Sequence, residues 1–311
     1  MHIAIFGTGG AGGYFGALLA KAGHQVIFIA RGEHLNAIRT NGLTVETPGG
    51  DVLVNPARAT DDPSEFGVVD LILVGVKAWQ VKEAAQAMGS MLGTETLVLP
   101  LQNGVEAAPE LAAELGGPSV LGGLCSTFSW ITAPGRIKNI GIANFIKFGE
   151  RDGSRSERTE ILKRMFELAG ISADIPDDIN QAIWMKFLAV TAFGGVGALT
   201  RAPIGVQRST PQTRRLLEHC IVEAFNLSKA MEIGLPVSAA TATMAFLDGL
   251  PPTATTSLQR DIADGKPSEL EYWNGAVKRL AEYADVPAPT HGLIYNFLLP
   301  LELRSRGNLF F

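Results

Sequence analysis

A single lysine interrupts a long apolar stretch in the second half of this sequence. The segment IWMKFLAVTAFGGVGALT (183–200) carries Lys186 near its start and no other charged residue. A lysine in such a place can lay its aliphatic chain over apolar surface and hold its ammonium group in water. It can instead face a binding cleft and donate a proton to a substrate oxygen, because partial desolvation brings the pKa of an amine toward neutrality while a nearby carboxylate keeps it charged. The residues alone leave both interpretations open.

A second group of polar residues lies in TSLQRDIADGKPSELEYW (256–273). Ser257 and Asp261 are four residues apart, so a helix places them on one face. Glu269 stands at the start of the next expected helix. In the absence of other information, these positions are typical of helix ends, because a residue such as Ser268 caps a helix and a glutamate favours its N-terminus.

The first residues of the chain contain a glycine-rich turn. The pattern G-x-G-x-x-G, made by Gly7, Gly9 and Gly12, follows the apolar run HIAIFG (2–7) and opens a helical pattern. A dinucleotide site needs a tight turn, a close approach of backbone to pyrophosphate, and N–H groups at a helix N-terminus. A tight structural connection is the alternative. The strand-turn-helix context favours a dinucleotide site made by Gly7, Thr8, Gly9, Gly10, Ala11 and Gly12.

The end of the second expected strand distinguishes the two common dinucleotides. A carboxylate there accepts a hydrogen bond from the ribose 2′-hydroxyl of NAD. Here the strand ends in FIARGEH, which places Arg31 at that point. A guanidinium group suits a 2′-phosphate and cannot accept a hydroxyl proton. The sequence therefore predicts NADP; the alternative is that Arg31 is solvated and Glu33 or Asp51 reaches the ribose.

Two more polar residues follow expected strands. Lys77 closes LILVGVK, and Asn103 follows LVLPLQ. Parallel strands end at one edge of a sheet, where open α/β sheets bind ligands. We expect Lys77 to meet the phosphate or ribose of the cofactor. Asn103 carries a donor and an acceptor, so it suits either the nicotinamide side or a substrate oxygen.

Carbonyl reduction by NADPH requires a proton or positive charge at the carbonyl oxygen. None of the five histidines is well placed: His2 and His24 begin strands at the wrong edge, and His219 falls in mid-helix. A lysine is then the natural general acid, and Lys186 is the candidate. No pair of histidines or cysteines has metal-ligand spacing, so we predict no metal.

The composition excludes several classes of partner. A net charge of −5 and a pI near 5.6 argue against a nucleic-acid-binding surface. No basic amphipathic stretch is suited to a membrane. Cys125 and Cys220 are too few for a disulfide framework and fit a reducing compartment. The start of the chain lacks the pattern of a signal peptide, so we expect a cytoplasmic protein.

Residues 1–176 alternate apolar strand-like runs with helical ones, which predicts a Rossmann-type parallel sheet covered on both faces. Its expected strands include SVLGGLCS (119–126). Residues 177–311 show helical patterns only. We therefore predict an α/β fold, with an NADP-binding domain over 1–176 followed by an all-α substrate and dimerisation domain over 177–311. Such an arrangement favours an active site in the cleft between the domains.

Local signals add detail to this division. LTVETPGGDVLVNPARAT predicts a hairpin turning at PGGD, and residues 127–150 predict another that turns near Pro134-Gly135. Ser154 and Glu157 form an expected capping box for a helix to Gly170. In the second half, one helix is expected to end near Gly194 and another to run from Pro211 to Gly234. Further helices are expected at about 238–248, 253–264, 268–285 and 290–303.

Taken together, these segments resemble the ketopantoate reductase (2-dehydropantoate 2-reductase) family along nearly the whole chain. The resemblance is carried by the glycine motif, Arg31, and the blocks VKAWQV, QNGV, IWMKFL and TSLQRDIADGKPSELEYWNG. It implies a 6-phosphogluconate-dehydrogenase-like fold, NADPH as cofactor and Lys186 as general acid. It also implies that Asn103 and Ser257 contact substrate, and that Glu269 helps to hold the lysine, the substrate or the cofactor ribose.

The sequence departs from the family at three positions. Where the family usually has asparagines, this chain has Val190, Gly194 and Ile204. Lys186, Val190 and Gly194 share one face of a helix. Replacing amides with apolar groups is expected to change substrate choice.

The sequence therefore predicts an NADPH-dependent reductase of a 2-oxo acid, with 2-dehydropantoate, an intermediate of pantothenate biosynthesis, as the best single substrate. An NADP-dependent dehydrogenase of a less polar hydroxy or oxo compound is one alternative. A non-catalytic NADP(H)-binding sensor is another, because a fold alone does not establish an activity. The apolar helices of the second half favour a homodimer.

Overall fold

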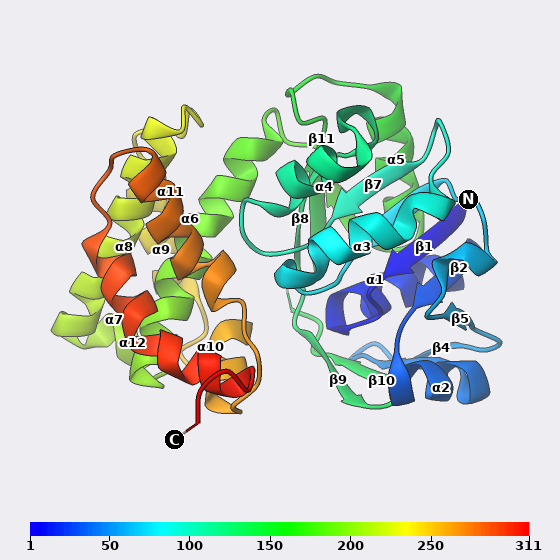
Figure 1. The fold of residues 1–311 in the computed structure, drawn as a ribbon, viewed down its shortest axis with the longest axis horizontal. Helices are drawn as coiled ribbons and strands as arrows, with labels where there is room; N and C mark the ends of the chain where they lie inside the picture. Colours follow the sequence, from blue (N-terminus) through cyan, green and yellow to red (C-terminus); the bar gives the residue numbers. More distant parts are fainter. Residues whose placement is uncertain (143, 311) are drawn as a thin grey trace. The chain divides into compact units, whose positions relative to one another are not determined.

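The computed structural model describes residues 1–142 and 144–310. The chain forms two compact units (Figure 1). The first consists of Met1–Gln102 and Glu106–Asn180, and the second of Asn103–Val105 and Gln181–Phe311. The division thus falls a few residues after position 176 and assigns the short segment that contains Asn103 to the second unit.

The first unit is built on a five-stranded sheet with the order β5-β2-β1-β6-β7. Every neighbouring pair in it is parallel. The order runs outward from β1 in both directions, as in doubly wound dinucleotide-binding folds, so the predicted Rossmann-type sheet is confirmed. Its strands are β1 (His2–Phe6), β2 (Gln25–Ile29), β5 (Arg58–Thr60), β6 (Leu71–Val74) and β7 (Leu97–Pro100).

Helices cover both faces of this sheet, because successive strand residues point to opposite sides. Ile3 and Ile5 belong to a buried cluster with residues of α1, α2 and α5. Ala4 and Phe6 belong to another cluster with residues of α3 and α4. Residues 3–6 of β1 are apolar at every position because neither face of the sheet meets water there. The helices are α1 (Gly10–Lys21), α2 (Gly32–Asn41), α3 (Val81–Ala87), α4 (Ala107–Leu115) and α5 (Glu157–Leu168).

A second sheet confirms the two predicted turns. It has the order β4-β3-β10-β9. The strands β3 (Leu43–Glu46) and β4 (Val52–Val54) pair antiparallel around PGGD, and β9 (Ser129–Ala133) and β10 (Arg136–Asn139) pair antiparallel around Pro134-Gly135. The second hairpin is shorter than the 127–150 expected.

A third sheet, β12-β11-β8, takes up the remaining strands of the first unit. The strand expected over 119–126 is β8 (Gly122–Ser126), and it pairs antiparallel with β11 (Phe145–Gly149). Its inclusion in the parallel sheet was therefore wrong; an isolated bridge between Val120 and Val98 links this segment to β7. The strand β12 (Ser172–Asp174) pairs parallel with β11.

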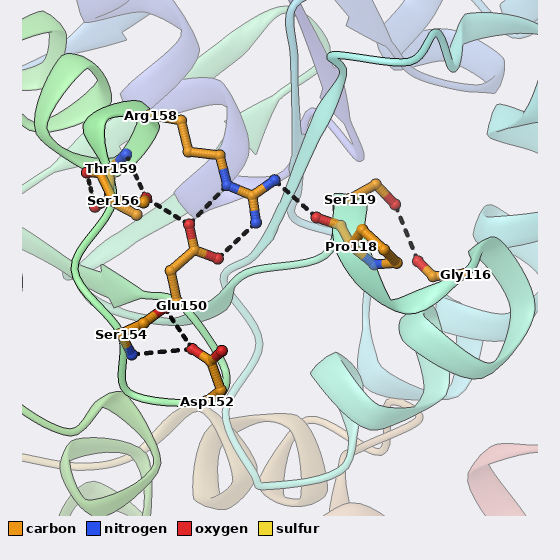
Figure 2. A network of polar contacts seen from close by, with 9 residues as sticks. All are labelled: Gly116, Pro118, Ser119, Glu150, Asp152, Ser154, Ser156, Arg158 and Thr159. Atoms are coloured by element: carbon orange, nitrogen blue, oxygen red, sulfur yellow. Dashed lines mark hydrogen bonds and ion pairs between the residues drawn. The ribbon is translucent and has the colours of Figure 1, made fainter.

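A polar cluster fixes the passage from β11 to α5 (Figure 2). Arg158 donates from Nε and Nη2 to the two carboxylate oxygens of Glu150 at 2.6 Å each, and Ser156 donates to Glu150 at 2.5 Å. The hydrogen bond from Arg158 lowers the pKa of Glu150. Arg158 also donates to the carbonyl oxygen of Pro118, which joins the segment before β8 to the start of α5.

The predicted capping box at Ser154 is wrong. The helix begins at Glu157, and its N-cap is Ser156, whose hydroxyl accepts from the N–H of Thr159. The Ser154 hydroxyl donates instead to Asp152 at 2.6 Å in the preceding turn. Because Glu150, which directly follows β11, holds the Ser156 side chain, this contact selects which serine caps the helix.

Within the described part of the second unit, every regular element is helical. Its core is one apolar cluster to which the α-helices contribute. The elements are α6 (Ile179–Thr200, which begins in the first unit), α7 (Ile204–Ser209), α8 (Pro211–Ala230), α9 (Ala239–Gly249), α10 (Ser257–Ala263), α11 (Asn274–Tyr283) and α12 (Pro289–Ser305). Short 3₁₀ turns lie at Pro63–Glu65, Ala78–Gln80, Met88–Met91, Gly117–Ser119 and Leu270–Tyr272.

The expected end of α6 near Gly194 is wrong, because the helix continues to Thr200. Its glycines allow close packing instead of ending it. A Cβ at Gly194 would lie 2.5 Å from the ring of Trp273, and one at Gly195 would lie 2.5 Å from the amide of Asn274. The helix expected over 268–285 is also divided, into a 3₁₀ turn and α11.

The helix α6 is long and apolar enough to cross a membrane by length and composition. However, 67% of its most apolar window is buried inside the protein, as in the core helix of a globular unit.

Buried polar groups join four helices of the second unit around His291. Its Nε2 lies 3.0 Å from the carbonyl oxygen of Cys220, and its Nδ1 lies 3.0 Å from the amide nitrogen of Asn274, which also donates to Thr191. A carbonyl oxygen only accepts and an amide nitrogen only donates, so this geometry assigns the ring proton to Nε2. Burial lowers the pKa of His291, against the opposing effects of the Cys220 carbonyl and the Glu223 carboxylate.

This burial predicts acid sensitivity. Because the pKa is lowered on folding, the unfolded chain binds more protons once the pH falls below about 6.5, and the free energy of unfolding then decreases by up to about 1.4 kcal/mol per pH unit. In urea unfolding between about pH 6.5 and 5, the His291→Gln variant should show a shallower pH dependence than the wild type. The exposed His219 provides the control, and His219→Gln should keep the wild-type slope. Equal slopes for all three proteins would contradict the assignment.

Candidate active site

Two of the motif glycines are required by the fold itself. Gly7 has φ = +100°, a conformation that favours glycine, and a Cβ there would lie 2.5 Å from the backbone nitrogen of Val76. A Cβ at Gly12 would lie 2.2 Å from the carbonyl oxygen of Gly7. The first glycine therefore turns the chain, and the second lets α1 pack closely against the turn.

Gly9 is different, because none of the described residues requires a glycine there. Its φ of −85° is open to any residue, and a Cβ would meet no atom within 4 Å. The open position lies at the N-cap of α1, where free N–H groups favour an anion. This is the space a pyrophosphate needs to approach the backbone, so the turn fits a dinucleotide.

The other residues of the turn hold it in place. Thr8 is buried, and both its N–H and its hydroxyl donate to the carbonyl oxygen of Ile29 at 3.0 Å. A Cβ at Gly10 would lie 2.2 Å from the carbonyl oxygen of Ser129, so this glycine allows β9 to approach. Ala11 is half-buried in the first turn of α1. Thr8 therefore positions the turn through both its backbone and its side chain.

Arg31 lies between β2 and α2 and is the N-cap of α2. Its side chain is exposed, and its Nη2 lies 2.7 Å from a carboxylate oxygen of Glu83 on α3. Ion pairs this exposed contribute roughly 0–1 kcal/mol, so an arriving phosphate can displace the carboxylate at little cost. The position is the one predicted for recognition of the 2′-phosphate.

Replacing Arg31 with alanine should weaken NADPH binding by about 10- to 100-fold, the range for losing a charge-assisted hydrogen bond, and should leave NADH binding nearly unchanged. Titration of the protein with each dinucleotide measures this difference. Arg136→Ala is the matched control. Arg136 on β10 also makes an exposed ion pair, with Glu46 on β3. If Arg31→Ala lost affinity for NADPH and NADH equally, Arg31 would not be the residue that recognises the 2′-phosphate.

Lys77 follows β6, at the same edge of the sheet as the glycine turn. It is half-buried and is the N-cap of the 3₁₀ turn Ala78–Gln80, and its ammonium lies 5.8 Å from the ring centre of Trp79. Gln102, at the end of β7, donates to the carbonyl oxygens of Val74 and Val76. This glutamine therefore fixes the loop that carries Lys77.

The predicted residues Asn103, Lys186, Ser257 and Glu269 all belong to the second unit. Lys186 is half-buried on α6, two turns before Gly194. Ser257 is half-buried at the first position of α10, and Glu269 is 6% exposed at the N-cap of the 3₁₀ turn Leu270–Tyr272.

Close contacts show that the segments carrying these residues meet. A Cβ at Gly104 would lie 3.1 Å from the carbonyl oxygen of Tyr272, so the Asn103-Gly104 turn lies against the segment of Glu269. A Cβ at Gly194 would lie 2.5 Å from Trp273 and 3.3 Å from Leu258, so α6 meets both that segment and the start of α10. The fold thus gathers four chain segments, each carrying one predicted residue, within one unit.

The three positions that depart from the family pattern also have apolar surroundings. Gly194 faces the indole of Trp273, which is 1% exposed and fills the space that a side chain at 194 would need. Val190 packs against the apolar core, and Ile204 is fully buried in it.

Sequence patterns did not reveal three neighbours of these residues. Glu83, Trp273 and Gln102 contact Arg31, Gly194 and the Lys77 loop through tertiary structure. Trp273 and Gln102 lie inside the segments that carry the family resemblance. That resemblance was the one signal in the sequence that could have identified them.

Sequence models of a known family cover both units. "Ketopantoate reductase PanE/ApbA" matches residues 3–153, and "Ketopantoate reductase PanE/ApbA C terminal" matches residues 178–302. The chain belongs to the ketopantoate reductase family. The resemblance predicted from the sequence is confirmed.

Individual relatives agree with this assignment. A 2-dehydropantoate 2-reductase of Mesorhizobium japonicum is 29% identical, over 93% of this chain and 94% of the relative. The crystal structure of a PanE/ApbA family ketopantoate reductase from Ralstonia eutropha matches with a TM-score of 0.90 and 29% identity, over 98% of this chain and all of that one. A structure of D-mandelate dehydrogenase with NADH and anilino(oxo)acetate also has a TM-score of 0.90, over 98% of this chain and 99% of its own, but its 22% identity shows the fold alone.

Ketopantoate reductase family proteins are NADP-dependent oxidoreductases that act on CH–OH groups. The predicted enzyme class and the predicted NADP cofactor are therefore confirmed at the level of the family.

Proposed function

We propose that this protein uses NADPH to reduce a 2-oxo acid to the 2-hydroxy acid, with 2-dehydropantoate, which gives pantoate, as the first candidate substrate. Membership of the family supports the reaction. The observation that supports its location is the meeting of four segments in one unit, which carry Lys186, Asn103, Ser257 and Glu269.

When bound, NADPH supplies a hydride to the carbonyl carbon of the substrate. The backbone N–H groups around Gly9 would hold its pyrophosphate at the start of α1, where a Cβ at Gly9 would meet no atom within 4 Å. Arg31 would bind the 2′-phosphate, Lys77 a phosphate or ribose oxygen, and Asn103 the nicotinamide side.

Lys186 is the proposed general acid, and its ammonium donates a proton to the carbonyl oxygen. Its place on a largely buried helix reduces its contact with water, which strengthens an electrostatic interaction with the developing alkoxide. Glu269 would hold the lysine charged and oriented, while Ser257 and Asn103 would hydrogen-bond to the substrate. A positioned acid of this kind contributes about 10²- to 10⁴-fold to the rate.

A less polar 2-oxo acid is a second candidate, which the packing around Gly194 favours. Trp273 leaves no room for an amide side chain at this position, and Ile204 is fully buried in the core. A site without these amides has fewer groups to hydrogen-bond a substrate hydroxyl, so it discriminates less against aliphatic or aromatic side chains.

The cellular setting is also a proposal. The two cysteines, Cys125 and Cys220, are buried thiols that form no disulfide with each other, which supports a reducing compartment such as the cytoplasm. A role in pantothenate biosynthesis depends on the substrate being 2-dehydropantoate. Pairing of two copies through the helical unit remains a prediction.

A panel of 2-oxo acids tests the proposal. The purified protein is assayed for NADPH and NADH oxidation with 2-dehydropantoate and with 2-oxo acids that carry aliphatic or aromatic side chains. The proposal expects one or more of them to be reduced, with NADPH preferred. A higher kcat/KM for 2-dehydropantoate than for every apolar analogue would exclude the second candidate.

A further inference from the structure

Three side chains along α12 each bind one residue of the segment 268–274 in the second unit. Glu302 binds Ser268, Tyr295 donates from its hydroxyl to Glu271 at 2.6 Å, and His291 binds Asn274 at 3.0 Å. Glu269 lies inside this segment. The C-terminal helix therefore fixes the stretch of backbone from which the proposed active-site carboxylate extends.

The contact between Glu302 and Ser268 is deeply buried. Ser268 is fully buried, and the Glu302 side chain is 6% exposed. The Ser268 N–H donates to both oxygens of Glu302, at 3.2 and 3.0 Å, and its hydroxyl donates to Oε2 at 2.5 Å. Arg306 donates from Nε to Oε1 at 2.6 Å.

Only a carboxylate satisfies this arrangement. All three groups that face Glu302 are donors, and they are divided between its two oxygens. A glutamine has the same shape but presents one NH₂ group, which would face the Nε–H of Arg306 at one position or the N–H of Ser268 at the other. Losing a hydrogen bond in so buried a place leaves a polar group unsatisfied, and the turn would shift to relieve it.

The same contacts hold the peptide groups on both sides of Glu269. The Ser268 carbonyl, in the peptide before Glu269, accepts from Arg306 Nη2 at 3.1 Å. The Leu270 N–H, in the peptide after it, donates to the Ser268 hydroxyl oxygen at 3.3 Å. Because both flanking peptides are fixed, the direction in which Glu269 leaves the backbone is fixed too.

We propose that Glu302 is a positioning residue for Glu269: it holds Ser268, and through Ser268 and Arg306 it sets the orientation of the active-site carboxylate. This inference rests on the proposed function, in which Glu269 acts beside Lys186. Glu302 itself is not proposed to touch substrate or cofactor.

The test is a double-variant cycle with NADPH and the best substrate of the 2-oxo acid panel. Glu302→Gln should lower kcat/KM by about tenfold, as a partial displacement of an active-site group does. Whichever of kcat and KM is changed by Glu269→Gln should also be the one changed by Glu302→Gln. In the Glu269→Gln background it should have no further effect, because a residue that acts only through Glu269 has nothing left to position. Ser268→Ala should behave like Glu302→Gln, and Ser268→Thr, which keeps the hydroxyl, should retain most of the activity.

Glu223→Gln is the matched control. Glu223 is also a buried glutamate that accepts backbone N–H groups of α12, from Thr290 and His291, at the other end of the helix. It should lower thermal stability without changing the kinetics at a temperature where the protein is folded. Hydrogen exchange of the Ser268 and Leu270 amides, measured without substrate, should be faster in Glu302→Gln and unchanged in Glu223→Gln.

Two outcomes would overturn the inference. One is that Glu302→Gln lowers stability while its kinetics match those of the wild type; the other is that its effect adds in full to that of Glu269→Gln. If Lys186→Ala still lowers turnover in these cases, the proposed function stands and only the positioning role fails. If neither Lys186→Ala nor Glu269→Gln affects turnover, the proposed function fails, and this inference fails with it.

Discussion

Replacing Lys186 with alanine should lower the turnover of NADPH with a 2-oxo acid by about 10²- to 10⁴-fold, the contribution of a positioned general acid. The substitution removes the only charged side chain of the α6 segment 183–200. NADPH binding should persist, because the groups proposed to bind its phosphates lie in the other unit. The measurements are steady-state kinetics and an NADPH titration of the same preparation.

A second lysine of the helical unit serves as the control for this experiment. Lys278 on α11 makes an ion pair with Glu282 at 2.7 Å and lies outside the proposed site. Lys278→Ala should retain wild-type turnover. If Lys186→Ala also retained it, while folded, then Lys186 would be a lysine that reaches water from an apolar helix, and the proposed mechanism would be wrong.

Replacing Gly9 with alanine should weaken NADPH binding by about 10- to 100-fold, the range for losing a hydrogen bond to a charged group. The fold should be nearly unaffected, because the Cβ meets no atom within 4 Å and the backbone angles are open to alanine. The methyl group would occupy the space through which pyrophosphate approaches the backbone. Dinucleotide titration and thermal unfolding measure the two effects separately.

Two other glycines provide contrasting controls. Gly89 also has open space around it and lies far along the chain from the turn, so Gly89→Ala should change neither binding nor stability. Gly10→Ala should destabilise the protein, because its Cβ would lie 2.2 Å from the carbonyl oxygen of Ser129. Tight NADPH binding by Gly9→Ala would show that the dinucleotide does not approach the backbone at this point.

The repeating pattern of the first half was sufficient to predict its sheet. Runs such as IAIF (3–6) are apolar at every position because both faces are covered, and this pattern differs from that of a half-exposed strand. Turn residues predicted the hairpins at PGGD and Pro134-Gly135 for a similar reason, since their preferences are local.

The failures came from positions that tertiary contacts decide. Gly194 was interpreted as a helix end, yet it is a packing site for Trp273, which lies 79 residues later in the chain. Ser154 has the spacing of a capping box, but Glu150 holds Ser156 in that role. A local pattern cannot distinguish a glycine that ends a helix from one that admits a neighbour.

The site shows the same limit. The residues of the second unit were predicted because each stands in a segment with its own signature, and the fold brings those segments together. Glu302 had no such signature: it is one glutamate in an apolar helix, and its role appears only through contacts with Ser268, 34 residues away. Contacts at this separation are set by helix packing, which the sequence pattern does not specify.

The most direct measurement of the central claim is product formation by the wild-type protein. The protein is mixed with NADPH and each 2-oxo acid of the panel, and both NADPH consumption and the 2-hydroxy acid formed are quantified. At least one 2-oxo acid should be converted, with one NADPH consumed per 2-hydroxy acid formed. Tight binding of NADPH with no consumption across the whole panel would contradict it and identify the chain as a binding protein on the fold of a reductase.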